Sequence, residues 1–134
     1  CILKASQLQK VSQKVYTITY TFDCIVYGDT HVETLTSQSA FLFIHGAKET
    51  EAVVTIHNKT DSIIAMAGIT GFSVRNLAVG EKIIIDGERK LVTSNGMNAF
   101  DRVDFLSFPR FKAGSNDISV TGAAEVTIKY RERW

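Results

Sequence analysis

The sequence predicts an all-β protein built as an antiparallel two-sheet β-sandwich. From residue 40 onward, short runs of β-branched and aromatic residues alternate with turn residues, at a spacing typical of sandwiches. Several runs alternate apolar and polar residues, as strands do when one face packs on a core. No segment of roughly ten residues or more with helical periodicity separates these runs, so a parallel α/β fold is not expected. A closed barrel remains an alternative.

The composition is typical of a globular chain with a hydrophobic core. The chain has 134 residues, of which 45% are hydrophobic and 22% charged, and its net charge is +1. This balance gives no electrostatic signature of nucleic-acid binding. Apolar runs such as Ala40–Ile44 are far shorter than the roughly 20 residues that span a bilayer. We therefore expect neither a nucleic acid nor a membrane as a partner.

The N-terminal segment carries the weakest pattern. The chain begins with Cys1 rather than Met and shows no apolar signal-peptide region, so we expect a fragment of a longer protein. Two cysteines, Cys1 and Cys24, do not make a disulfide framework, and free thiols are expected. Leu8, Val11 and Val15 lie at i, i+3 and i+7, a spacing that predicts one or two helical turns.

A long strand is predicted from Val15 to Ile25, because aromatic and aliphatic residues alternate there with threonines. A strand of this length either joins a large sheet or pairs with another chain. Tyr27–Ser39 is polar and is predicted to be turn-like, so a domain boundary is placed within it. Residues 1–38 are expected to end a preceding domain or linker, and residues 39–134 to form the sandwich.

The sandwich strands are predicted from their apolar runs. In chain order they are Ala40–His45, Ala52–Asn58, Ile63–Ile69, Phe72–Leu77, Lys82–Asp86, Lys90–Ser94, Ile118–Thr121 and Glu125–Glu132. Asp86-Gly87 predicts a hairpin because glycine accepts positive φ, and Gly122–Ala124 predicts a second one. Asn95–Asp104 is expected to be a surface loop. In the last strand the residues expected to face the core are Val126, Ile128 and Tyr130.

Two pairs of carboxylates are candidates for chemistry. Asp86 and Glu88 are close in sequence, but a hairpin tip alone accounts for them. Asp101 and Asp104, with Arg102 between them, could form a metal or sugar site, but the pattern favours a solvated loop.

Histidines, cysteines and serines do not form a recognisable constellation in the sequence. His31, His45 and His57 lack the short spacing of a preorganised zinc site. Neither cysteine has a histidine neighbour, and there is no Gly-x-Ser-x-Gly motif. We therefore expect no catalytic residues, no bound metal, no cofactor and no enzymatic activity.

The C-terminal residues are candidates for contacts instead. Lys129, Arg131 and Arg133 share one strand face with Glu125, which is a solvated face or one that meets an acidic partner. Trp134 could pin the chain end to its own domain or insert into a neighbour.

Three pieces of the chain together form a recognisable pattern. The first is Tyr16-Thr17-Ile18-Thr19-Tyr20-Thr21-Phe22-Asp23-Cys24. The second runs from Ile83-Ile84-Ile85-Asp86 to Asn95-Gly96-Met97-Asn98. The third runs from Phe108-Pro109 to Asp117-Ile118 and ends with Ile128-Lys129-Tyr130-Arg131-Glu132-Arg133-Trp134. With these pieces the chain resembles the distal tail proteins of siphophages. The resemblance implies a galectin-like or jelly-roll-like sandwich, preceded by a strand left over from a ring-forming N-terminal domain.

The same resemblance implies an architectural function. Members of the family form hexameric rings between tail tube and tail tip and anchor receptor-binding or tail-lysin proteins. We therefore expect a structural virion component of the tail tip or baseplate, assembled in the bacterial cytoplasm. The alternative is a carbohydrate-binding module that contacts host cell-wall polysaccharide, with Phe100, Phe105 and Trp134 as the candidate stacking residues.

Overall fold

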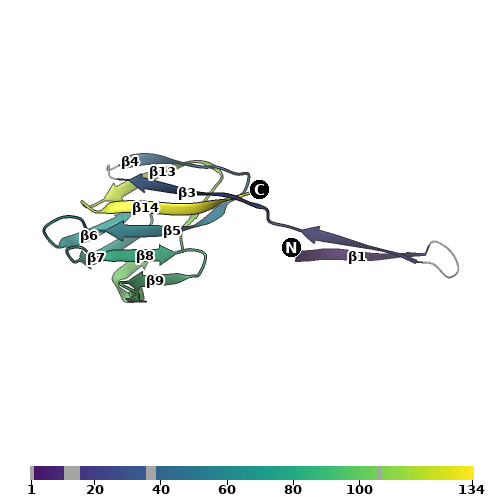
Figure 1. Ribbon diagram of the computed structural model, residues 1–134, viewed down its shortest axis with the longest axis horizontal. Coiled ribbons are helices and arrows are strands. Elements are labelled where there is room, and N and C mark those ends of the chain that lie inside the picture. The colour runs from purple at the N-terminus through teal and green to yellow at the C-terminus, as the bar shows by residue number, and fades with distance from the viewer. Residues whose placement is uncertain (1, 11–15, 36–38, 106) are drawn as a thin grey trace.

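The computed structural model describes residues 2–10, 16–35, 39–105 and 107–134. These residues form fourteen β-strands and one short 3-10 helix, and they contain no α-helix. A two-stranded hairpin projects from one end of a sandwich of two antiparallel sheets (Figure 1). The predicted all-β, two-sheet architecture is therefore confirmed.

The projecting hairpin consists of β1 (Ile2–Lys10) and β2 (Tyr16–Asp23), which pair antiparallel. The helical turns predicted around Leu8 are wrong, because Leu8 lies in β1 opposite Ile18 and cross-strand pairing overrides a weak periodicity. Val11 and Val15, also part of that prediction, lie outside the described residues. Cys24 follows β2 and is disulfide-bonded, so the expectation of a free thiol is wrong for this residue.

The larger sheet has seven strands in the order β10-β9-β8-β5-β14-β3, with β12 also paired to β5. Its strands are β3 (Tyr27–Leu35), β5 (Thr50–His57), β8 (Lys82–Asp86), β9 (Leu91–Ser94), β10 (Met97–Asn98), β12 (Arg110–Phe111) and β14 (Glu125–Arg133). Strand β14 lies inside this sheet, between β5 and β3. Its apolar residues Val126, Ile128 and Tyr130 are buried as predicted.

The structure differs from the turn-like conformation that the sequence predicts for Tyr27–Ser39. Tyr27–Leu35 form β3, an edge strand that pairs with β14. Only Leu35 of this strand is fully buried, so the strand shows little apolar alternation in its sequence. Its extended conformation is set by pairing with a strand almost a hundred residues away, as with Val126 opposite Leu35.

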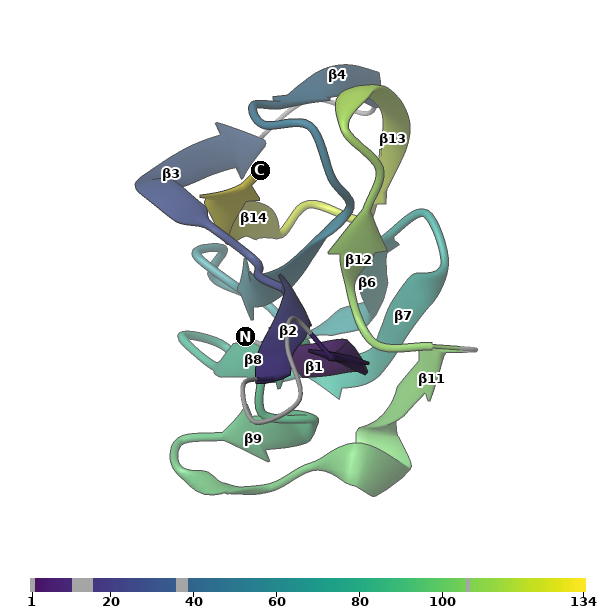
Figure 2. The same ribbon diagram turned by 90° about the vertical axis from the view of Figure 1, so that its right-hand side faces the viewer.

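The smaller sheet has five strands in the order β11-β7-β6-β13-β4 and lies face to face with the larger one (Figure 2). Its strands are β4 (Ser39–Ile44), β6 (Ile64–Ile69), β7 (Phe72–Leu77), β11 (Val103–Phe105) and β13 (Gly114–Thr121).

Two predictions about the connections between strands are wrong. Gly122–Ala124 connect β13 to β14 in the other sheet, so they do not close a hairpin. The expected loop Asn95–Asp104 contains β10, the 3-10 helix η1 (Phe100–Arg102) and part of β11.

The hairpin predicted at Asp86-Gly87 is confirmed, because β8 and β9 pair antiparallel. Gly87 does not supply the positive φ that the prediction assigned to it. Lys90, at φ 57°, takes the positive φ of this turn, while Gly87 is not among the positive-φ residues. A Cβ on Gly87 would lie 2.5 Å from the Pro109 carbonyl oxygen. Glycine is therefore needed here because another segment of backbone approaches closely.

The core fills the space between the two sheets. Val54 and Ile56 of β5 and Ile128 of β14 face Leu42 and Ile44 of β4, and all five are buried. Close packing of aliphatic side chains between two sheets is the main source of stability in a sandwich. None of the described helical segments is long and apolar enough to cross a membrane.

Candidate functional site

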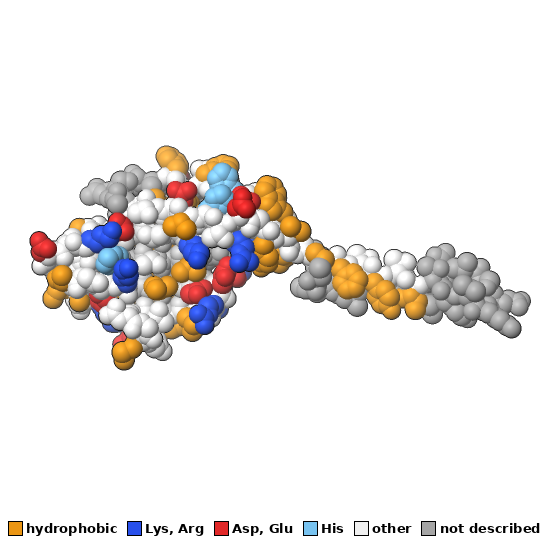
Figure 3. All heavy atoms as spheres, viewed as in Figure 1, with side chains coloured by type: hydrophobic (Ala, Val, Ile, Leu, Met, Phe, Trp, Pro, Cys, Tyr) orange, Lys and Arg blue, Asp and Glu red, His pale blue; other side chains and the backbone are white. Residues whose placement is uncertain are grey.

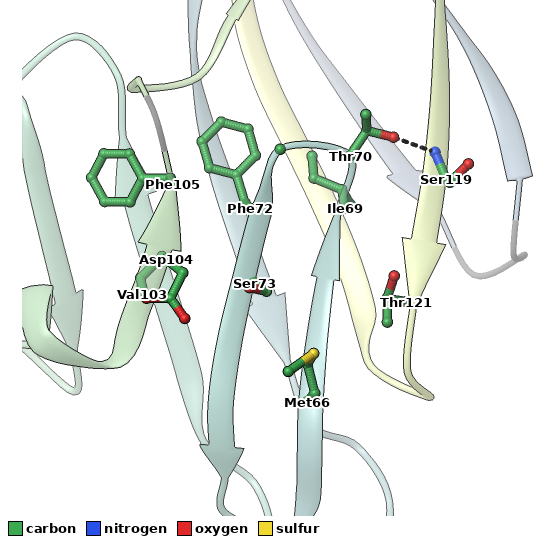
Figure 4. A pocket seen from close by; sticks show the side chains of 11 residues that line it. Met66, Ile69, Thr70, Phe72, Ser73, Val103, Asp104, Phe105, Ser119 and Thr121 are labelled. Atoms are coloured by element: carbon green, nitrogen blue, oxygen red, sulfur yellow. Dashed lines mark hydrogen bonds between the residues drawn. The ribbon is translucent and has the colours of Figure 1, made fainter.

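A groove lies on the outer face of the five-stranded sheet and has a volume of about 800 Å³ (Figure 4). Register pairs place Thr121, Gly68, Ser73 and Asp104 side by side across β13, β6, β7 and β11. We call these four residues the row. Neighbouring strands lie about 4.8 Å apart, so the row spans roughly 14 Å. Gly68 itself is buried, and the members of the row that line the groove are Thr121, Ser73 and Asp104.

Two phenylalanine rings border one end of the groove. Phe72 begins β7 and Phe105 ends β11, and the two rings lie side by side at the strand ends (Figure 4). Their centroids are 6.1 Å apart, with the planes tilted by 32°. Phe100 and Phe108 pack against Phe105 from the other side, at 5.7 and 4.9 Å between centroids. Phe72, Phe105 and Phe108 are partly buried and pack against the hydrophobic core, whereas Phe100 is 44% exposed.

Hydroxyl groups and one carboxylate supply the polar part of the groove. Besides the row, Thr70 and Ser119 line it, and the Ser119 N–H donates to Thr70 Oγ1 at 2.8 Å. Asp104 Oδ2 lies 3.6 Å from Arg75 Nε, and Arg75 also donates to the Asp101 carbonyl oxygen at 3.0 Å. Asp104 is the charged side chain among the described residues that line the groove. The groove therefore offers hydroxyls, a carboxylate and aromatic surface.

The candidate carboxylates from the sequence do not converge. Asp86 Oδ1 accepts the backbone N–H groups of Glu88 and Arg89, each at 3.0 Å, so it shapes the hairpin turn. Asp101 lies in η1 and Asp104 in β11, where it is part of the groove. Among the described residues no group of three His, Cys, Asp or Glu side chains is arranged to hold a metal ion.

Two of the three histidines meet where the hairpin joins the sandwich. The His31 ring stacks on His45 at 4.7 Å between centroids, and His31 Nε2 donates to Glu132 Oε1 at 2.8 Å. This hydrogen bond holds the pKa of the Glu132 carboxyl below its usual value. His57 lies apart from them at the end of β5, opposite Glu125.

Trp134 contacts its own chain, and its side chain is 52% exposed. Its backbone N–H donates to the Val26 carbonyl oxygen at 2.9 Å, and its Nε1 donates to Glu132 Oε2 at 3.3 Å. Arg131 lies with its guanidinium carbon 5.2 Å from the centre of the Tyr27 ring. The basic face of β14 is therefore partly occupied by contacts at this junction.

Glu81 and Arg102 form an ion pair that the sequence did not predict. Glu81, whose side chain is only 8% exposed, accepts hydrogen bonds from Arg102, from the Ser94 hydroxyl and from the Ala78 N–H. The hydrogen bonds from Arg102 lower the pKa of the Glu81 carboxyl from 4.5 to about 2. Arg102 also donates to the Asn76 carbonyl oxygen at 2.7 Å. Nothing local in the sequence connects these residues.

The hairpin presents apolar side chains to solvent. Ile18, Tyr20 and Phe22 lie on one face of β2 and are 52–57% exposed. Hydrophobic side chains run along the hairpin and continue onto the adjoining end of the sandwich (Figure 3). A second exposed pair, Phe41 and Phe43, lies on the edge strand β4. Exposed apolar surface of this kind commonly marks contacts with other proteins.

The fold and these surfaces define a β-sandwich module with an apolar arm and an open groove. The chain belongs to the family of siphovirus-type tail components, since the model of that family's C-terminal domain matches residues 45–134. The resemblance to siphophage distal tail proteins is thereby confirmed. At this level the predicted class, a structural component of a phage tail virion, is confirmed as well.

A solved structure shows the same fold. The chain is similar to the Dit protein of phage SPP1, described as a paradigm of the hub adsorption apparatus in phages that infect Gram-positive bacteria. The TM-score is 0.69 at 14% sequence identity, and the match covers 98% of this chain. The chain spans 58% of the length of that protein. No curated protein matches the chain significantly.

Proposed function

We propose that this protein is an assembly hub of a siphophage tail tip. It would connect the tail tube to receptor-binding proteins or to a tail-associated lysin, without enzymatic activity of its own. Family membership is the observation that carries this proposal. The exposed apolar arm, with Ile18, Tyr20 and Phe22, supports it because an isolated two-stranded hairpin is marginally stable in water and gains most from packing on another surface.

In the full-length protein the hub is a hexameric ring in the virion, assembled in the bacterial cytoplasm before the tail is complete. The hairpin belongs to the ring-forming part of that protein, and the sandwich faces the tail tip. The division into residues 1–38 and 39–134 stays a prediction. Pairing of β3 with β14 favours a boundary at residues 24–26, because it places Tyr27–Leu35 within the sandwich.

Mass photometry of the full-length protein over rising concentrations tests this function. We expect ring-sized particles, together with capture of the tail tube protein or a receptor-binding protein on co-expression. A protein that stays monomeric at high concentration and captures neither partner would contradict the proposal. In that experiment, Tyr20→Ser is matched by Thr19→Ser on the opposite face of β2, and only the former is expected to weaken assembly.

A second candidate function is contact with host cell-wall polysaccharide, and the groove favours it. Hydroxyls, a carboxylate and aromatic rings line one open surface depression of about 800 Å³. The candidate residues from the sequence contribute unequally. Phe105 borders the groove with Phe100 packed behind it, whereas Trp134 lies at the hairpin junction. Co-sedimentation with purified Gram-positive cell walls tests this function, and a chain that stays wholly in the supernatant would refute it.

A further inference from the structure

We propose that the groove on the five-stranded sheet is a binding site for a neutral saccharide, held by Thr121, Ser73 and Asp104 of the row and by the rings of Phe72 and Phe105. This inference rests on the second candidate function and names its ligand class and its residues. It is independent of whether the hub forms a ring.

The shape of the groove is fixed by backbone register. The row is made of residues directly opposite one another on four adjacent strands, so its spacing cannot change without breaking the sheet. Gly68 allows the backbones of β6 and β7 to approach closely. A Cβ there would lie 2.0 Å from the Phe72 carbonyl oxygen, so a larger residue at this position requires the backbone to move. The result is a shallow, open trough whose floor is the paired backbone of the sheet.

The chemistry of the groove fits an amphipathic ligand that is rich in hydroxyls. Ser73, Thr121 and Ser119 present hydroxyls that can both donate and accept, and Asp104 can accept two hydrogen bonds. Phe72 and Phe105 offer apolar surface against which the C–H face of a sugar ring can pack. The Asp104 side chain is 63% exposed, and a purely apolar ligand would take it and the neighbouring hydroxyls out of water without offering them hydrogen-bond partners.

The negative charge of Asp104 favours a neutral saccharide over a phosphate-rich polymer as the ligand of the groove. The carboxylate of Asp104 lines the groove, and the nearby Arg75 is already engaged with Asp104 and with the Asp101 carbonyl oxygen. None of the described residues that line the groove is a lysine or an arginine. A polyanion entering the groove would therefore meet a like charge without a free cation to offset it.

The full chain is titrated calorimetrically with chitotriose, cellotriose and maltotriose, and with poly(glycerol phosphate) as the anionic comparison. We expect saturable binding of at least one neutral trisaccharide at millimolar concentration or below, and none of the polyanion. Asp104→Asn should weaken that binding about tenfold, the usual effect of losing one hydrogen bond to a charged group. Failure of all three saccharides to bind, or binding of the polyanion alone, would overturn the proposal.

Ser73→Trp fills the groove and is matched by Thr127→Trp, which lies at an equivalent central position on the outer face of the other sheet. We expect Ser73→Trp to abolish binding and Thr127→Trp to leave it unchanged. Phe105→Leu keeps the local packing while removing the ring, and serves if Ser73→Trp does not fold. Cell-wall co-sedimentation distinguishes the proposed groove site from the proposed contact with cell walls. If Ser73→Trp still binds cell walls, the groove is not the binding site, but the contact with cell walls stands. If the unmodified chain neither binds a saccharide in calorimetry nor sediments with cell walls, both the groove site and the contact with cell walls are refuted.

Discussion

Replacing Glu81 by glutamine should destabilise the protein by an amount that depends on pH. The carboxylate is almost fully buried and holds Arg102, the Ser94 hydroxyl and the Ala78 N–H, so the amide leaves a guanidinium without its counter-charge. A pKa lowered from 4.5 to about 2 corresponds to at most about 3.4 kcal/mol of stabilisation. Because the Arg102 side chain is 31% exposed, screening by solvent reduces this figure, and we expect about 2 kcal/mol at neutral pH.

The stabilisation contributed by Glu81 should decrease as the pH falls. The folded state binds the proton of Glu81 more weakly than the unfolded state does, so the contribution is complete above pH 4.5 and is lost as the pH falls toward 2. Urea denaturation of the wild-type chain and of Glu81→Gln, at pH 7 and at pH 3, measures the difference. We expect the gap between the two proteins to shrink by roughly half at pH 3.

A matched control is Glu125→Gln, which removes the exposed ion pair with Lys59. That pair has a similar N–O distance of 2.9 Å, but the Lys59 side chain is 56% exposed, so its loss should change stability by less than about 0.5 kcal/mol. Equal effects of the two substitutions, or a Glu81→Gln effect that does not vary with pH, would refute the reasoning from burial and lowered pKa.

Three further predictions concern the core and the turns. Ile128→Ala should cost about 2–5 kcal/mol in thermal or urea unfolding, because the side chain is fully buried, while exposed Lys129→Ala should cost less than about 0.5. Tyr130→Phe should cost about 1 kcal/mol, since its phenol donates to a backbone carbonyl oxygen at 3.1 Å. Gly87→Ala should destabilise by more than Gly71→Ala, for which about 1 kcal/mol is expected from positive φ alone. The opposite order would show that the close approach at Gly87 relaxes without cost.

Local pattern predicted the interior strands and failed at the edges. Val126, Ile128 and Tyr130 alternate with polar residues, and this period identified β14 and its buried face. In β3 only Leu35 is buried, so the sequence offers no apolar period and the strand depends on pairing with β14. The link from Gly122 to the last strand looks like a hairpin locally. Its true course depends on which sheet each strand joins, and distant pairings decide that.

The groove could not be predicted from the sequence for a related reason. Thr121, Gly68, Ser73 and Asp104 are ordinary small or polar residues far apart in the chain, and they become neighbours only through the registers of three strand pairs. The sequence suggests a loop site shared by Asp104 and Asp101, whereas Asp104 lies on strand β11. A row of this kind carries no sequence motif, because register is a property of the folded sheet.

The meeting of Val26 with Trp134 has a consequence for how the sandwich can be used as a building block. Its first and last strands run next to each other, so entry and exit of the chain lie at the same corner. A domain with adjoining ends can be inserted into a loop of a host protein, or circularly permuted, with little distortion of the recipient. The same corner is therefore a natural grafting point, where foreign domains could be exchanged without rebuilding the two sheets.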